Sequence, residues 1–206
     1  LMYQGVVDNE GILTISDSTF RNNDSYGITN EGTLLVERVS LINMQRGLHN
    51  AGTATVINAT ISGNSDYGIL NYLDSNILVK NSTIAFNTGA NGGGINAYAG
   101  GFRLANTIVA NNISTIANNG DCSGMFVSDG HNLIGNIGKD LNGNGYFDCR
   151  ADWSAFDLIG YVTHDNQNRR ITALLGALVE RPAGSNIWIH PLKLGSPAID
   201  NGNEAA

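Results

Sequence analysis

The feature that most constrains the fold is an internal repeat of 20 to 25 residues. The triplets Asn9-Glu10-Gly11, Asn30-Glu31-Gly32 and Asn50-Ala51-Gly52 recur at intervals of 21 and 20 residues. Each triplet precedes two apolar residues with one residue between them: Leu13 and Ile15, Leu34 and Val36, Ala54 and Val56. This alternation is typical of a half-buried β-strand. The repeat therefore predicts a strand at the same place in each unit.

The second landmark is a Ser, Thr or Asn followed by an apolar residue. This apolar residue lies five positions after the second apolar residue of the strand signal, as Phe20 does after Ile15. The pairs are Thr19-Phe20, Ser40-Leu41, Thr60-Ile61, Thr83-Ile84, Thr107-Ile108 and Asn132-Leu133. We expect Phe20, Leu41, Ile61, Ile84 and Ile108 to form one interior column. Three residues after most of these apolar residues stands an asparagine, at Asn23, Asn64, Asn87, Asn111 and Asn136. These asparagines are expected at a turn, where stacked amides hydrogen-bond to one another.

The third landmark is a glycine before an aliphatic residue, as in Gly27-Ile28 and Gly68-Ile69. Three short strand signals per unit describe one coil of a three-sided solenoid, whose coils must stack because one coil cannot bury its own apolar face. The predicted fold is all-β, a right-handed single-stranded parallel β-helix with coils over residues 1–136. The alternative is a β-sandwich, but its strands would not repeat particular residues in register.

Residues 137–206 lack the repeat and contain both tryptophans and all three prolines. We expect an irregular loop and an apolar C-terminal cap in the same domain, covering the open edges of the last coil. Ile171–Leu175 and Ile187–Ile189 are predicted strand or cap elements.

Cys122 and Cys149 are the two cysteines of the chain. An even count without a CxxC pair or a nearby His cluster favours a disulfide over zinc. A bridge would indicate an oxidising compartment. The alternative is two unrelated buried thiols.

Several motifs in order resemble one family of surface proteins. They are Gly195-Ser196-Pro197-Ala198-Ile199-Asp200, Asp121-Cys122-Ser123-Gly124, Gly130-His131-Asn132-Leu133-Ile134-Gly135-Asn136 and Asn81-Ser82-Thr83-Ile84. Together they resemble the choice-of-anchor Q proteins, bacterial surface β-helices akin to polymorphic outer-membrane proteins. The segment from Tyr161 to Leu192 matches the family's late region only loosely. The resemblance implies export, display through a separate anchor, and no established catalytic activity.

Residues 140–148 match the front of a calcium-binding loop. The predicted ligands are Asp140, Asn142, Asn144, the carbonyl of Tyr146, Asp148 and, one residue later than usual, Asp152. Gly145 permits the sharp reversal, but position 12 is Ala151, so the usual bidentate acid is missing and calcium would bind weakly. The alternative is an Asn/Gly turn that holds no ion.

Tyr26 and Tyr67 hold equivalent places two coils apart and are candidate sugar-stacking residues, although two such tyrosines can equally pack on their own coils. Parallel β-helices also host polysaccharide lyases and hydrolases. A glycosidase needs two carboxylates about 5–10 Å apart, and Asp24 and Asp66 are the candidates. More often such residues are solvated turn acids.

The net charge of −7 and the scattered basic residues argue against nucleic acid as a partner. No apolar run is long enough for a membrane span. The chain starts at Leu1 within the repeat pattern, so we expect any secretion signal or anchor to lie outside it. The predicted function is a non-catalytic extracellular or cell-surface module, structural or adhesive, with coil-on-coil self-association and glycans as partners. The alternative is a polysaccharide-binding or polysaccharide-degrading β-helix.

Overall fold

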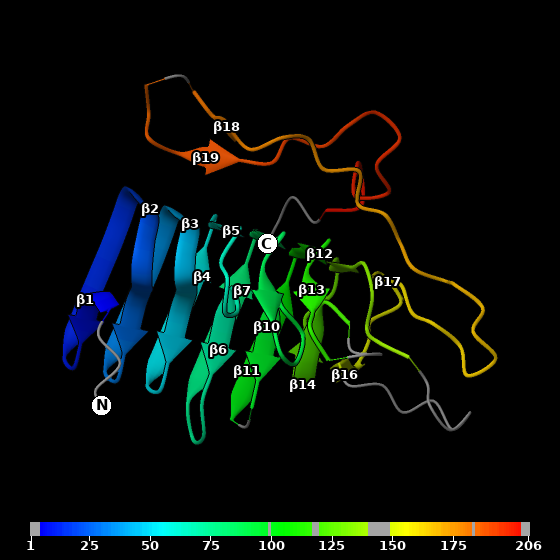
Figure 1. Cartoon of the computed structure of the whole chain (residues 1–206), viewed down its shortest axis with the longest axis horizontal. Coiled ribbons are helices and arrows are strands. Elements are labelled where there is room, and N and C mark those ends of the chain that lie inside the picture. The colour runs from blue at the N-terminus through cyan, green and yellow to red at the C-terminus, as the bar shows by residue number, and fades with distance from the viewer. Residues whose placement is uncertain (1–4, 99, 117–119, 140–148, 183, 203–206) are drawn as a thin grey trace.

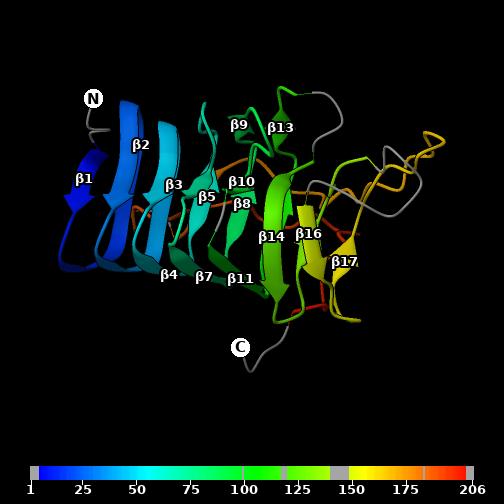
Figure 2. The same ribbon diagram turned by 90° about the horizontal axis from the view of Figure 1, so that it is seen from below.

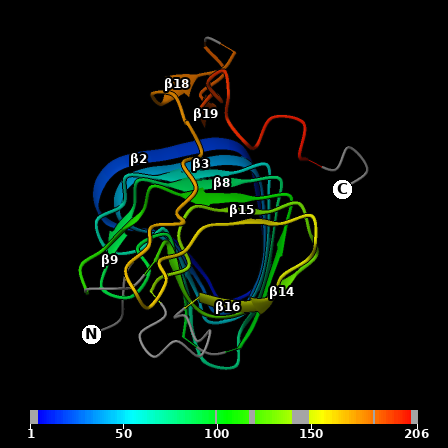
Figure 3. The same ribbon diagram turned by 90° about the vertical axis from the view of Figure 1, so that its right-hand side faces the viewer.

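The computed structural model describes residues 5–98, 100–116, 120–139, 149–182 and 184–202 and is a parallel β-solenoid of about six turns. Successive coils lie side by side along the rod (Figures 1 and 2). Viewed from the C-terminal end, the chain winds as a right-handed coil (Figure 3). The predicted fold class is confirmed. Within the described ranges, no helix is long and apolar enough to cross a membrane.

Each coil contributes strands to three faces. Face A consists of the first parts of β2 (Ile12–Asn30) and β3 (Thr33–Asn50), then β4 (Thr53–Ile57), β7 (Asn76–Lys80) and β11 (Gly101–Ala105). Face B consists of the middle parts of β2 and β3, then β5 (Thr60–Ser62), β8 (Thr83–Ala85), β12 (Ile108–Ala110), β15 (Leu133–Ile134) and β17 (Leu158–Ile159). Face C consists of β1 (Gly5–Asn9), the last parts of β2 and β3, β6 (Ile69–Asn71) and β10 (Ile95–Ala97).

Three further pieces complete the solenoid. β14 (Cys122–Ser128) pairs with β10 at its start and with β11 at its end, so it passes from face C to face A. β16 (Cys149–Asp152) pairs with β14. β9 (Thr88–Gly89) and β13 (Ile113–Ser114) form a small separate parallel sheet.

The predicted interior column of face B is confirmed for four of its five members and wrong for the fifth. Phe20, Leu41, Ile61 and Ile84 pair in register from coil to coil. The next member is Val109 rather than Ile108, because Ile108 pairs with Thr83 on the outward side. The same shift of one residue replaces Leu133 by Ile134, which is fully buried. Ile108 and Leu133 instead belong to a second apolar cluster with Ala85, Ala110, Ala173 and Leu175.

Two buried asparagine ladders run along the solenoid. The first consists of the asparagines of the repeated triplets and continues to Asn71, each Nδ2 donating to the next Oδ1 at 2.7–2.8 Å. The second runs from Asn64 through Asn87 to Asn112. Asn112 therefore takes the place predicted for Asn111, because the face B register is shifted by one residue there. Asn23 and Asn136 lie outside this ladder, and Asn23 instead accepts a hydrogen bond from the amide of Ser25.

The predicted disulfide is present between Cys122 and Cys149, whose Cα atoms lie 5.2 Å apart. Both cysteines are fully buried in the main core. The coils extend beyond the predicted end at residue 136, because β16 and β17 pair with β14 and β15. The disulfide therefore links the last coil to the one before it.

The C-terminal segment lies elsewhere than predicted. Residues 171–182 and 184–202, the C-terminal strap, run back along the outer side of face B rather than across the end of the last coil (Figure 1). The strap leaves the last coil at Ile171. Farther along the strap, the backbone oxygen of Asn186 is hydrogen-bonded to Thr19 in the N-terminal coils. The strap then turns back, and the backbone oxygen of Asn201 is hydrogen-bonded to His131. At its far end β18 (Val179–Glu180) and β19 (Trp188–Ile189) form an antiparallel hairpin. The outer side of face B is apolar only at its C-terminal coils, where the strap covers Ile108 and Leu133. Over the N-terminal coils the strap is held by hydrogen bonds.

Candidate ligand-binding surfaces

The predicted calcium loop lies almost entirely outside the described residues. Asp140, Asn142, Asn144, Tyr146 and Asp148 are in the undescribed range 140–148, and Asp152 is exposed at the end of β16. Within the described part of the chain, no group of three His, Cys, Asp or Glu residues is arranged to hold a metal ion. Calcium binding stays a prediction, which thermal unfolding with and without millimolar calcium tests.

The predicted pair of tyrosines is buried. Tyr26 and Tyr67 are 6% and 7% exposed and enclose Arg46, which occupies the same place in the intervening coil. The Arg46 Cζ atom lies 4.4 Å from the centroid of the Tyr26 ring and 5.7 Å from that of Tyr67. Arg46 also forms an ion pair with Asp66. These contacts hold the two rings against their own coils, so neither ring offers an open face to a sugar.

A row of four aromatic rings crosses face C in successive coils. Tyr26 contacts His49 edge-on, with the ring centroids 6.0 Å apart, and His49 contacts Tyr72 in the same way at 5.9 Å. Tyr72 and Tyr98 are stacked at 5.8 Å with an interplanar angle of 13°. Tyr72 and Tyr98 are equivalent because each follows a residue of the register pair Asn71 and Ala97.

Exposure increases along this row from the buried ring of Tyr26 to 46% for Tyr72 and 65% for Tyr98. Burial, together with the nearby charge of Arg46, lowers the pKa of His49 to about 4. The His49 ring is therefore neutral at neutral pH and packs as an apolar aromatic. The buried half of the row fixes the position of the exposed half.

The exposed end of the row belongs to a larger apolar patch, which we call the aromatic patch. Met125 is 69% exposed at the place in the next coil that corresponds to Tyr98, since Ala97 pairs with Gly124. The patch consists of Tyr72, Tyr98 and Met125, which hold equivalent places in three successive coils and are exposed. Leu73, next to Tyr72 in the chain, and Val127, two residues beyond Met125 on β14, are also exposed. The facing sides of the two stacked rings are occupied by each other, so the patch offers their remaining surface and the Met125 side chain to the C–H groups of a sugar. This surface was not among the sites predicted from the sequence.

The candidate carboxylates of a glycosidase differ in their surroundings. Asp66 is ion-paired with Arg46. Asp24 is exposed and lines a surface groove of about 440 Å³ together with Asn43 and Gln45. The carboxylate of Asp66 is occupied by its ion pair with Arg46, whereas the two carboxyl groups of a glycosidase flank the bond that is cleaved. The pair therefore gives no support for hydrolysis.

Asp121 is a buried acid at the end of the second asparagine ladder. Its Oδ1 atom accepts hydrogen bonds from Nδ2 of Asn112, at 3.0 Å, and from the backbone amide of Asn112. Burial raises the pKa of Asp121 to about 7 against the opposing effect of these hydrogen bonds. An aspartate suits this place because each amide of the ladder donates toward the C-terminus and the last residue need only accept. Its role is structural.

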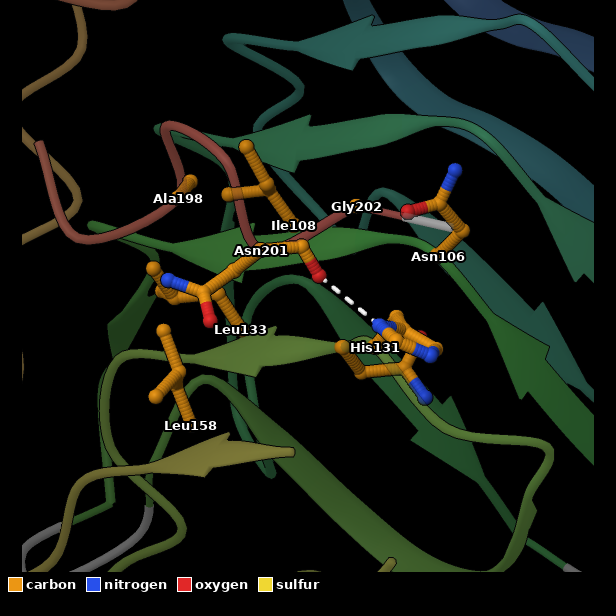
Figure 4. A pocket seen from close by; sticks show the side chains of 9 residues that line it. Asn106, Ile108, His131, Leu133, Leu158, Ala198, Asn201 and Gly202 are labelled. Carbon is orange, nitrogen blue, oxygen red and sulfur yellow. Dashed lines mark hydrogen bonds between the residues drawn. The ribbon is translucent and has the colours of Figure 1, made fainter. Parts of the chain in front are cut away.

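A small pocket lies between the strap and face B (Figure 4). Its apolar floor includes Ile108 and Leu133, and its polar rim includes Asn106 and His131. The Nδ1 atom of His131 lies 2.9 Å from the backbone oxygen of Asn201, which fixes the end of the strap. The pocket volume is about 80 Å³, whereas ligand pockets usually measure roughly 300–1,000 Å³. The pocket is large enough for a few water molecules and too small for a sugar ring.

Comparisons of the chain with protein-family models, with curated proteins and with solved structures find no match.

Proposed function

We propose that this chain is a non-catalytic, rod-like module of an exported bacterial surface protein that adheres to glycans through the aromatic patch. The observation that carries the proposal is the stacked pair Tyr72 and Tyr98, which is exposed at one end and anchored at the other by His49 and Tyr26. Large exposed apolar patches on soluble proteins often mark binding surfaces.

The rigidity of the rod favours this use. The two exposed rings are held by backbone pairing to neighbouring coils and by their contact with each other, so little conformational entropy is lost when a sugar stacks on them. A repeating glycan also matches a surface that repeats every coil, about 4.8 Å along the rod. The resemblance to choice-of-anchor Q proteins and the disulfide agree with export to an oxidising compartment.

Affinity electrophoresis in native gels that contain neutral polysaccharides tests the proposal. We expect a β-glucan, mannan or xylan gel to retard the protein, and the variant Tyr72→Ala/Tyr98→Ala to migrate freely. Phe156→Ala is the matched control, because Phe156 is also 65% exposed but lies beside His131 outside the patch. Equal retardation of the double variant and the wild type would contradict glycan binding by the patch.

A second measurement tests the non-catalytic part of the proposal. The protein is incubated for a prolonged time with each polysaccharide that retards it in the gel. We expect no new reducing ends and no unsaturated products that absorb in the ultraviolet. Either product would identify the protein as a hydrolase or a lyase. Light scattering on the same samples measures self-association, which stays a prediction.

A further inference from the structure

The hairpin of the strap stands over the outer side of face B at the N-terminal coils (Figure 1). Thr19 donates a hydrogen bond from its hydroxyl to the backbone oxygen of Asn186. Ser40 forms two hydrogen bonds with the backbone of Trp188. These contacts hold Trp188 and Asn186 at a fixed place beside β2.

A groove of about 480 Å³ lies between this hairpin and β2. Its lining includes Asp17, Thr19, Arg21, Asn186 and Trp188. The volume is within the range of small-ligand sites, roughly 300–1,000 Å³, and the lining combines an aromatic ring with polar side chains. In size and composition it differs from the small pocket near His131.

Among the residues that the structure describes, Arg21 is the cation of this groove without an acidic partner. The carboxylate of Asp17 accepts hydrogen bonds of 2.7 and 2.8 Å from Arg38, which hold the pKa of Asp17 below its usual value. Arg21, in contrast, forms no ion pair within the described residues. Although the chain has a net charge of −7, the guanidinium of Arg21 gives this groove a locally positive electrostatic potential that attracts anions.

Trp188 orients that guanidinium. The Arg21 Cζ atom lies 5.0 Å from the centroid of the Trp188 ring, a cation–π contact that occupies the face of the ring. Such a contact leaves the N–H groups at the edge of the guanidinium available to a ligand. The planar fork of arginine matches the two oxygens of a carboxylate.

We propose that this groove binds the carboxylate of an acidic sugar, such as a uronate unit of a polysaccharide, with Arg21 on the carboxylate and Asn186 beside the hydroxyl groups. The remaining surface of Trp188 packs against the C–H groups of the sugar. This site is separate from the aromatic patch, since it lies on face B and uses charge, and it does not depend on the patch.

The test uses oligogalacturonate as the probe and the fluorescence of Trp188 as the signal, measured in the full chain carrying Trp153→Phe. We expect the fluorescence of Trp188 to change in a saturable way as oligogalacturonate is added, and not to change with neutral malto-oligosaccharides of the same length. Arg21→Gln should weaken binding at least tenfold, and Arg21→Lys, which keeps the charge but loses the fork, should weaken it severalfold. Arg169→Gln, an exposed arginine of the turn beyond the last coil, should leave it unchanged.

Several outcomes would overturn the proposal. They are an equal response to neutral and acidic oligosaccharides, unchanged binding by Arg21→Gln, and tighter binding of a sulfated or phosphorylated oligosaccharide than of oligogalacturonate. Circular dichroism and hydrogen exchange of the hairpin check whether Arg21→Gln retains its fold, and we expect both to match the wild type. Tyr72→Ala/Tyr98→Ala must keep full affinity for oligogalacturonate, so a failure of the aromatic patch and a failure of this site are distinguishable.

Discussion

Ser40 and Trp188, 148 residues apart in sequence, form a reciprocal pair of hydrogen bonds. The Trp188 amide donates to Ser40 Oγ at 2.9 Å, and Ser40 Oγ donates to the Trp188 carbonyl oxygen at 3.2 Å. One hydroxyl thus satisfies both backbone groups of a strap residue. The strap is held in two ways: by hydrogen bonds to Thr19, Ser40 and Ser62 over the N-terminal coils, and by apolar packing against Ile108 and Leu133 over the C-terminal coils.

Replacing Ser40 by Ala should release the hairpin without unfolding the solenoid. The Trp188 amide would lose its partner, at a cost of about 1–3 kcal/mol, while the interior column beneath stays intact. We expect faster hydrogen exchange over residues 179–189 and unchanged protection of Leu34–Leu41. Ser18→Ala, which removes a hydroxyl that among the described contacts donates to the nearby Ser16 carbonyl alone, is the control. Unchanged exchange in the hairpin of Ser40→Ala would show that apolar contacts alone hold it.

The contribution of Asp121 to stability should be smaller at alkaline than at mildly acidic pH. Its folded pKa of about 7 lies above the ordinary value of 3.8, so between these pH values the folded state retains a proton that the unfolded state has released. The stabilisation is complete below pH 3.8 and is lost as the pH rises through 7. At 1.36 kcal/mol per pKa unit, the loss between pH 5 and pH 8 is about 2–3 kcal/mol.

Urea denaturation at pH 5 and pH 8 measures this loss. The lowered pKa of His49 acts in the opposite direction over this pH range, in the wild type and the variant alike. On going from pH 5 to pH 8, Asp121→Asn should therefore lose about 2–3 kcal/mol less than the wild type, because the amide does not titrate. Asp74→Asn, at an exposed turn, should retain the wild-type difference. An identical change in stability between the two pH values in the wild type and in Asp121→Asn would refute the assignment.

Asn87→Ala should destabilise the solenoid far more than Asn23→Ala. The Asn87 Oδ1 atom accepts from the amide and side chain of Asn64, and its Nδ2 donates to Ile61 and Asn112. Loss of four buried hydrogen bonds should lower the free energy of unfolding by roughly 3–5 kcal/mol. Asn23 is exposed and, among the described contacts, is bonded only to the Ser25 amide. Asn23→Ala should therefore lower the free energy of unfolding by about 1 kcal/mol or less. Similar losses in both variants would mean that the ladder contributes little.

Reduction of the disulfide should loosen the last coil. In the chain-entropy model, closing the 28-residue loop stabilises the fold by roughly 3–4 kcal/mol. We expect dithiothreitol to lower the melting temperature and to increase exchange in β14 and β16, with little change in β2 and β3. Cys122→Ser/Cys149→Ser is the control, and it should be insensitive to reductant. An unchanged melting temperature on reduction would contradict this role for the bridge.

The solenoid is predictable from the sequence because stacking repeats the same side chain in every coil. The error of one residue at Ile108 has a physical cause. Ile108-Val109 and Leu133-Ile134 are adjacent apolar pairs, so hydrophobicity does not distinguish the inward from the outward member. In the earlier coils the outward residue is Thr or Ser, and the choice is clear. Two adjacent apolar residues in a strand indicate burial on both faces, and here they mark the part of face B that the strap covers.

The candidate sites were harder to predict for a related reason. Tyr26 and Tyr67 share a place in the repeat, but the sequence does not show that the intervening Arg46 occupies the space between their rings. Tyr72 and Tyr98 lie 26 residues apart, across turns of different length, so counting residues does not align them. The triplet asparagine column would have helped, because Asn71 continues it and Tyr72 comes directly after Asn71. The groove near Arg21 requires the strap, whose path no local pattern indicates.

The strap also has a bearing on how the length of this protein can change. The coils themselves would accept an inserted copy, because the asparagine ladder offers a donor and an acceptor at every junction. The strap has a fixed span between Ile171 and Asn186, so one added coil would shift Ser40 away from Trp188 by about 4.8 Å. Duplication of a coil between these anchor points would therefore have to be matched by extra residues in the strap, whereas coils added before β1 would need no such adjustment.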